Sequence, residues 1–171
     1  MELKGAGFLL RKWEPGDEQS LQKNANNKNI SRFLFDRFPF PYTMDDAELW
    51  VSMKVHQYRI TNFVIDIDGE VAGAIEFKQG DDVHKKNADL GYWLAEQFWG
   101  RGIMTEAVNL IIKYAFENFD LMRIQSAVNQ NNPASMRVLE KAGFKKEGIL
   151  KNAIFKDSEV MDEHVFGLCK D

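Results

Sequence analysis

Two periods of apolar residues alternate along this chain, and they predict strands and helices in a mixed order. From Ile103 to Asn118, apolar residues recur at helical spacing and polar residues fall on the opposite face, which predicts a long helix. The apolar runs Asn62 to Ile67 and Glu70 to Lys78 read as strands. They are joined at Asp68-Gly69, a strong signal for a β-hairpin.

The remaining strands and helices are predicted from shorter apolar patterns and from the residues that cap or terminate each element. Further strands are expected at 8–13, 88–94, 122–128, 144–155 and 160–168, and further helices at about 17–26, 43–59 and 132–142. In the last helix, Asn132 fits an N-cap, Pro133 the first helical position and Gly143 the residue past the end. This order predicts an α/β domain with a mixed, largely antiparallel sheet. The proline-broken aromatic segment 33–42 fits either the core or the wall of a substrate cleft.

Length and composition narrow the class of protein. The chain has 171 residues, of which 44% are apolar, and a formal net charge of −4. We expect a single domain over residues 1–171. The mild charge argues against direct nucleic-acid binding. With no apolar run near the roughly 18 residues that span a bilayer and no signal peptide, we expect a cytoplasmic protein that makes no membrane contact.

Cysteine and histidine chemistry is sparse. Cys169 is the only cysteine, so the chain cannot form an intrachain disulfide. His56, His84 and His164 are widely separated and lack the spacing of metal ligands. We therefore expect no metal site and no covalent catalysis through a cysteine.

The segment Gln97-Phe98-Trp99-Gly100-Arg101-Gly102 joins a predicted strand to the long helix. Two glycines let the backbone turn tightly and approach a ligand closely. The unpaired N–H groups of the first helical turn and the helix dipole favour an anion at the same place. The turn suits a phosphate or pyrophosphate, although a plain tight turn before a helix would use the same glycines.

Two familiar phosphate-binding motifs do not fit this turn. A dinucleotide fingerprint needs a third small residue three positions after the second glycine, where Thr105 stands. A P-loop needs Gly-Lys-Ser or Gly-Lys-Thr, which the segment lacks. A dinucleotide-dependent oxidoreductase is therefore a weak alternative.

The pattern Gln-x-x-Gly-x-Gly before an amphipathic helix resembles the acetyl-CoA signature of the GNAT superfamily of N-acetyltransferases. The stretch 132–144, with its Asn-x-x-Ser opening and Gly-Phe close, is similar to the family's downstream helix. The strand 88–94 is similar to the family's fourth strand. The segments 10–11, 15–17, 41–43 and 46–50 resemble the branch of Rim-type ribosomal-protein N-terminal acetyltransferases. The resemblance covers nearly the whole chain in the correct order.

The resemblance implies a GNAT-type sheet of about seven strands with about four helices, in which two strands splay apart at the acetyl-CoA site. Backbone groups near Trp93 and Leu94 would pair with pantetheine, and the glycine turn would hold the pyrophosphate. Asn132 would cap its helix and in addition donate to pantetheine, although capping alone explains the residue type. The implied acetyl-CoA contacts are Trp93, Leu94, Gln97, Trp99, Gly100, Arg101, Gly102, Ile103, Met104, Thr105 and Asn132.

Acetyl transfer needs a neutral amine, a polarised thioester carbonyl and a proton for the leaving thiolate. Many relatives place a tyrosine where this chain has Leu139, so Ser135 is the candidate acid, although serine there is also good capping chemistry. Asp89 and Glu76 are candidate bases, each with a plain solvated alternative. The position of a Rim-branch carboxylate is occupied by Ile154.

The acceptor follows from the resemblance and from the energetics of deprotonation. At pH 7 an α-amine costs about 1.4 kcal/mol to deprotonate and a lysine about 4.6 kcal/mol. A site without a dedicated base therefore favours a protein or peptide N-terminus. The alternatives are a small amine (a polyamine, amino acid or antibiotic) and a non-catalytic acyl-CoA-binding module. Relatives form monomers and homodimers, and no residue here chooses between them.

Overall fold

The computed structural model describes residues 2–170, which divide into two compact units. The first unit contains the described residues up to Glu76 together with Tyr92–Ile103. The second contains Phe77–Gly91 and the described residues from Met104 onward. Strands β4 (Glu70–Gln79) and β5 (Asn87–Leu94) contribute residues to both units.

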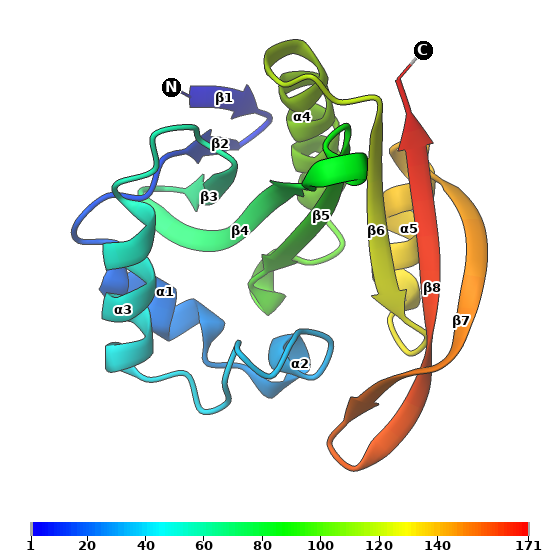
Figure 1. Cartoon of the computed structure of the whole chain (residues 1–171). Helices are drawn as coiled ribbons and strands as arrows, with labels where there is room; N and C mark the ends of the chain where they lie inside the picture. Colours follow the sequence, from blue (N-terminus) through cyan, green and yellow to red (C-terminus); the bar gives the residue numbers. More distant parts are fainter. Residues whose placement is uncertain (1, 171) are drawn as a thin grey trace. The chain divides into compact units, whose positions relative to one another are not determined.

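The first unit contains an antiparallel sheet and three α-helices (Figure 1). Strands β1 (Glu2–Gly5), β2 (Phe8–Arg11), β3 (Asn62–Ile67) and β4 pair in this order. The predicted hairpin is confirmed, because Asp68 and Gly69 both have positive φ, 55° and 83°, as a two-residue turn requires. The helices are α1 (Glu18–Ala25), α2 (Lys28–Ser31) and α3 (Met44–Lys54).

Helix α3 begins where the sequence predicted and ends earlier. Its N-terminus is a capping box, in which the Asp46 N–H donates to Thr43 Oγ1 at 3.2 Å and the Thr43 N–H donates to Asp46 Oδ2 at 2.8 Å. The helix stops at Lys54, so the prediction that it reached Arg59 was wrong. The Gln57 side chain donates to the Lys54 carbonyl at 3.2 Å and caps the end of the helix.

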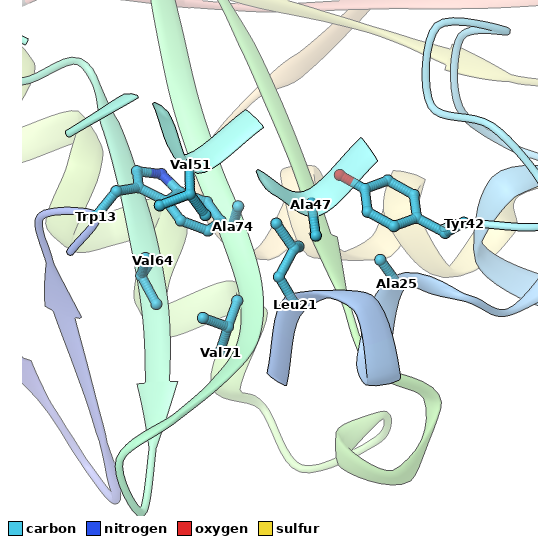
Figure 2. Packing of buried hydrophobic residues seen from close by; sticks show 9 residues of the cluster. All are labelled: Trp13, Leu21, Ala25, Tyr42, Ala47, Val51, Val64, Val71 and Ala74. Atoms are coloured by element: carbon cyan, nitrogen blue, oxygen red, sulfur yellow. The ribbon is translucent and has the colours of Figure 1, made fainter. Parts of the chain in front are cut away.

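Buried apolar side chains join α1 and α3 to the sheet of the first unit, as Figure 2 shows. Val64 on β3 lies directly opposite Ala74 on β4, and both belong to this cluster. The aromatic segment contributes Tyr42 to the same core, whereas Phe35 is 69% exposed. The cluster consists of Trp13, Leu21, Ala25, Tyr42, Ala47, Val51, Val64, Val71 and Ala74.

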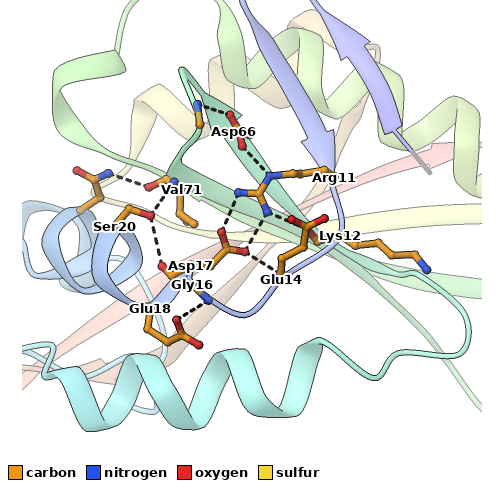
Figure 3. A network of polar contacts seen from close by, with 11 residues as sticks. Arg11, Lys12, Glu14, Gly16, Asp17, Glu18, Ser20, Asp66 and Val71 are labelled. Carbon is orange, nitrogen blue, oxygen red and sulfur yellow. Dashed lines mark hydrogen bonds and ion pairs between the residues drawn. The ribbon is translucent and has the colours of Figure 1, made fainter.

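A nearly buried ion network fixes the start of α1 to the sheet (Figure 3). The Arg11 guanidinium donates to both carboxylate oxygens of Asp17, at 2.9 and 2.8 Å, and to Asp66 at 2.6 Å. The Glu14 N–H also donates to Asp17, at 2.9 Å. The side chain of Arg11 is only 12% exposed, and hydrogen bonding to Asp17 raises its pKa. These bonds satisfy charges that burial would otherwise penalise.

The second unit combines a mixed sheet with two helices (Figure 1). The first residues of β5 pair in parallel with β6 (Arg123–Asn129). Strand β6 pairs antiparallel with β8 (Glu159–Cys169), which pairs antiparallel with β7 (Lys145–Lys156). The helices are α4 (Ile103–Asn118), which has the predicted bounds, and α5 (Pro133–Lys141). The β5–β6 ladder joins three residue pairs, although the strands have eight and seven residues.

The hydrogen-bonded strand order is β1-β2-β3-β4-β5-β6-β8-β7. This mixed, largely antiparallel sheet confirms the predicted fold class. Residues 2–170 contain eight strands and five α-helices, rather than about seven and four. The additional elements, β1 and α2, have four residues each, which is too short to show a period in the sequence. Two 3₁₀ turns, η1 (Asp82–His84) and η2 (Glu96–Phe98), complete the structure.

Candidate active site

The glycine turn connects the 3₁₀ turn η2 to helix α4, and its geometry requires glycine. Gly100 and Gly102 have φ values of 74° and 78°, where a residue with a side chain is strained. No atom lies within 4 Å of the position where a Cβ would stand on either residue. The backbone conformation, rather than packing, therefore explains both glycines.

The backbone of this turn presents N–H groups without acceptors. Within the described chain, no acceptor receives the N–H of Gly100, Arg101 or Gly102. The Trp99 N–H, which was predicted to hold the pyrophosphate, instead donates to the Glu96 carbonyl at 3.1 Å. Consecutive unpaired N–H groups at the entrance of a long helix are suited to an anion, so the pyrophosphate contact stays a prediction.

The polar side chains around the turn are used to hold it in place. The Gln97 amide donates to Asn24 Oδ1 at 3.0 Å, and Asn24 in turn donates to the Val71 carbonyl at 2.7 Å. The Glu96 carboxylate accepts from Asn27 at 2.6 Å and from Asn29 at 3.2 Å. The bond from Asn27, followed by that from Asn29, lowers the pKa of Glu96. The Gln97 side chain thus connects the turn to α1, although its backbone stays a predicted ligand contact.

The end of β5 precedes the turn and is closely packed in the first unit. The Ala95 N–H donates to the Ala72 carbonyl at 2.8 Å. A Cβ on Gly73 would collide with the Trp93 carbonyl oxygen, so only glycine permits this approach of β4 to β5. The Leu94 carbonyl accepts from the Trp99 indole at 2.7 Å. Contacts of Trp93 and Leu94 with pantetheine stay predictions.

Helix α5, in the second unit, carries Asn132 and Ser135. The predicted N-cap is confirmed, because Asn132 Oδ1 accepts from the Ser135 N–H at 3.2 Å. Among residues 2–170, no acceptor receives the Asn132 side-chain amide, which leaves it able to donate to a ligand. Ser135 is half-buried in the first turn, and Leu139 is fully buried in the core.

The two carboxylates predicted as bases are both engaged by neighbouring side chains. In the first unit, Glu76 accepts from the buried Asn62 amide at 2.5 Å and lies 3.8 Å from the Lys54 ammonium. In the second unit, Asp89 is exposed and accepts from the Gln125 amide at 2.8 Å. The structure therefore gives both residues a structural partner, and their catalytic roles stay predictions.

Sequence reasoning missed a third carboxylate, Glu163 on β8. It is half-buried, and burial raises its pKa. The available signal was a glutamate at the centre of the predicted strand 160–168, two residues from both Met161 and Val165. Raised carboxylate pKa values occur preferentially at functional sites.

The described residues also bear on metal binding and on membrane spanning. Among residues 2–170, no group of three His, Cys, Asp or Glu side chains is arranged to bind a metal ion. The longest helices in the described part of the chain are too short or too polar to cross a bilayer. Met104 and Thr105 lie in the first turn of α4, and the Arg101 guanidinium stacks on the Phe98 ring at 5.4 Å.

A strand, a glycine turn with unpaired N–H groups and a helix that follows it form an arrangement suited to a phosphorylated ligand. The family model for the acetyltransferase (GNAT) domain matches residues 8–145. The chain therefore belongs to the GNAT acetyltransferases, which confirms the resemblance found in the sequence.

Individual relatives agree with this family. The chain is 35% identical to the putative ribosomal N-acetyltransferase YdaF of Bacillus subtilis, over 95% of this chain and 91% of that protein. It is 27% identical to the spermidine N(1)-acetyltransferase of Escherichia coli, over 85% of this chain and 77% of that protein. The structure of RimL, a ribosomal L7/L12 α-N-protein acetyltransferase in complex with coenzyme A, aligns with a TM-score of 0.87 at 22% identity, over 99% and 98% of the two chains. At this identity the RimL alignment supports the fold alone.

Proposed function

We propose that this protein transfers the acetyl group of acetyl-CoA to the α-amine of a protein or peptide N-terminus. The observation that carries this proposal is the row of unpaired backbone N–H groups at Gly100, Arg101 and Gly102, directly before α4. These donors suit the pyrophosphate of coenzyme A. Membership of the GNAT acetyltransferases supports acetyl-CoA as the donor, and the name of YdaF, a putative ribosomal N-acetyltransferase, supports a ribosomal acceptor.

The proposed reaction is a direct attack within a ternary complex. The backbone at Trp93 and Leu94 and the Asn132 amide would hold pantetheine and the thioester. The half-buried Ser135 would supply a proton to the departing sulfur. No cysteine participates in this scheme, because Cys169 is exposed beside the C-terminal end of β8. A single domain, a cytoplasmic location and a monomeric or homodimeric state also stay predictions.

A small amine is the second candidate acceptor, and the identity to a spermidine N(1)-acetyltransferase favours it. The two candidates differ in the pKa of the attacking nitrogen, since a polyamine holds its proton more tightly than an α-amine near pH 7. A polyamine acetyltransferase should therefore lose more activity than an α-amine acetyltransferase as the pH falls from 9 to 7.

Release of free CoA thiol from acetyl-CoA tests the proposal with a panel of acceptors. The panel contains peptides with free N-termini, the same peptides with blocked N-termini and an internal lysine, spermidine, and single amino acids. We expect turnover with the free N-termini and none with the blocked peptides. Turnover restricted to spermidine would transfer the proposal to the small-amine class. Tight binding of acetyl-CoA without turnover on any amine would instead indicate a non-catalytic acyl-CoA-binding module.

A further inference from the structure

Strand β8 contains a half-buried carboxylate, Glu163, for which residues 2–170 provide no hydrogen-bond or ion-pair partner. Burial raises the pKa of Glu163, whereas its neighbour Asp162, bound by Lys151, has a lowered pKa. Partial burial of a carboxylate costs free energy, and no hydrogen bond or ion pair within residues 2–170 compensates this cost for Glu163.

The neighbours of Glu163 in the sheet are uncharged. The strand register places it opposite Asn129 on β6 and Leu150 on β7. Side chains directly opposite each other stand about 5 Å apart. Met161 and Val165 fall on the same face of β8, because side chains alternate along a strand. This surrounding explains the desolvation of the carboxylate.

The face of the sheet that carries Glu163 is exposed at Leu150 and Ala127, whereas Asn129 and Met161 on the same face are buried. Ala127 is exposed in the middle of β6, although the adjacent Ser126 and Val128 are buried. It pairs with Val165 on β8 and lies two residues before Asn129. The exposed side chains of Ala127 and Leu150 on either side of the carboxylate leave room for a small group such as an amine.

Asn129 also connects this face to helix α5. The Asn132 N–H donates to the Asn129 carbonyl at 2.9 Å, and the Asn131 N–H donates to Asn129 Oδ1 at 2.8 Å. Asn132 then caps the helix whose first turn contains Ser135. The residue opposite Glu163 therefore anchors the helix that carries the predicted acid.

We propose that Glu163 is the general base of the acetyl transfer, an inference that rests on the proposed function. Its carboxylate takes one proton from the ammonium group of the acceptor, and the nitrogen lone pair forms a C–N bond with the acetyl carbon. The C–S bond breaks with its electron pair on sulfur, which takes the Ser135 hydroxyl proton. The second proton lost by nitrogen restores Ser135, and Glu163 returns its proton to water. One proton is thus released for each acetyl group transferred.

The titratable groups beside Glu163 in the sheet differ from it in the face they occupy or in having a partner. Asn129 and Leu150, which pair with Glu163, do not titrate. Asp162 and His164 flank it on β8 and alternate to the opposite face. The Lys151 ammonium lies 2.7 Å from Asp162 and is bound there. If kcat rises with pH in the wild type and this rise is lost in Glu163→Gln, the rise reports deprotonation of the Glu163 carboxylate.

The test replaces Glu163 by glutamine, which keeps the shape of the side chain and removes the base. In the full-length protein with its best amine, we expect Glu163→Gln to lower kcat at pH 7 by about 10²- to 10⁴-fold. The KM for acetyl-CoA should stay within about threefold, since the donor turn is unchanged. The wild-type rise of kcat with pH should be replaced by a rate that follows deprotonation of the amine itself. Glu159→Gln, which removes an exposed charge from the same strand, is the matched control and should behave like the wild type.

Retention of kcat within about threefold together with the wild-type pH profile would overturn the assignment of Glu163. If Glu163→Gln does not fold, kcat and the KM for acetyl-CoA are measured for Glu163→Asp instead. This variant keeps a carboxylate but shortens the side chain by one methylene group. A lower kcat with an intact KM for acetyl-CoA supports the base, and an unchanged kcat refutes it. The proposed function fails separately, if the wild-type protein acetylates no amine at all.

Discussion

Asp17 in the first unit and Glu163 in the second are both shielded carboxylates, yet their surroundings are opposite. Asp17 accepts from two nitrogens of Arg11 and from the Glu14 N–H (Figure 3). Glu163 has uncharged neighbours, and within the described chain its side chain accepts from none of them. A carboxylate bound on all sides contributes to stability and is a poor base. An unpaired one costs stability and remains available for proton transfer.

The backbone donors of the two units also differ, but here the paired group lies in the second unit and the unpaired groups in the first. In α5, Asn132 Oδ1 accepts an N–H of the first helical turn, as capping requires. Before α4, the N–H groups of Gly100 and Gly102 have no acceptor among residues 2–170. Groups that the fold leaves unsatisfied therefore mark the proposed donor turn as well as the proposed base.

The largest expected effect comes from removing the nearly buried ion pair between Arg11 and Asp17. Asp17→Ala removes the bidentate partner of Arg11, whose side chain is only 12% exposed, so that the largely buried charge keeps its bond to Asp66 and loses two others. We expect the free energy of unfolding to fall by about 3–5 kcal/mol. Urea denaturation followed by circular dichroism measures this loss.

The matched control for Asp17 is the exposed pair between Lys23 and Glu70, whose side chains are 62% and 53% exposed. Glu70→Ala should cost less than about 1 kcal/mol, because water screens the pair. Equal losses from the two variants would show that burial does not distinguish the two ion pairs, and the comparison would fail.

The second largest expected effect is a loss of acetyl-CoA affinity when the unpaired backbone N–H groups of the glycine turn are displaced. Gly102→Val places a β-branched residue at φ 78°, which the side chain resists, so the turn should shift and redirect its N–H groups. Loss of two hydrogen bonds to a charged phosphate, each worth about 1.5 kcal/mol, corresponds to about 100-fold weaker binding of acetyl-CoA. Isothermal titration calorimetry measures this change.

Gly7→Val is the matched control for backbone strain, because Gly7 has φ 80° and no atom within 4 Å of its Cβ position. It should lower stability while the affinity for acetyl-CoA stays unchanged. Unaltered binding by Gly102→Val, in a folded protein, would exclude the glycine turn as the pyrophosphate site.

Features encoded by adjacent residues were predictable from the sequence. The helix Ile103–Asn118 has the predicted bounds, because its apolar period runs uninterrupted over four turns. The Asp68-Gly69 hairpin and the Asn132 cap are likewise set by two or three neighbouring residues. The family followed from the same kind of local pattern.

Features that depend on strand register or distant partners were not predictable. The bond between Gln97 and Asn24 joins residues 73 positions apart, so no pattern indicated that this side chain is a structural connection. Glu163 looked like any glutamate in a closing strand, because its isolation depends on Asn129 and Leu150 lying opposite it. The engagement of Glu76 by Asn62 also arises from the pairing of β3 with β4.

The smallest expected effect tests the cost of leaving Glu163 unpaired. Its folded pKa is raised above the unfolded value of about 4.3, so the folded protein binds the proton more tightly than the unfolded chain does. The ionised carboxylate therefore lowers stability above the folded pKa, and this penalty disappears as the pH falls below the unfolded pKa. Glu163→Gln should be more stable than the wild type at pH 7 by less than about 1 kcal/mol, because the half-exposed side chain is partly screened by water.

Urea unfolding of the wild type and Glu163→Gln at several pH values between 4 and 8 measures this difference. The two stability curves should converge as the pH approaches 4 and separate towards neutral pH. A loss of stability in Glu163→Gln at pH 7 would mean that the carboxylate makes favourable contacts in the folded protein. Glu163 would then resemble Asp17, and the contrast between a structural and a chemical carboxylate would not hold. Greater stability combined with lost turnover, in contrast, is the combination expected when a protein keeps an unpaired group for its chemistry.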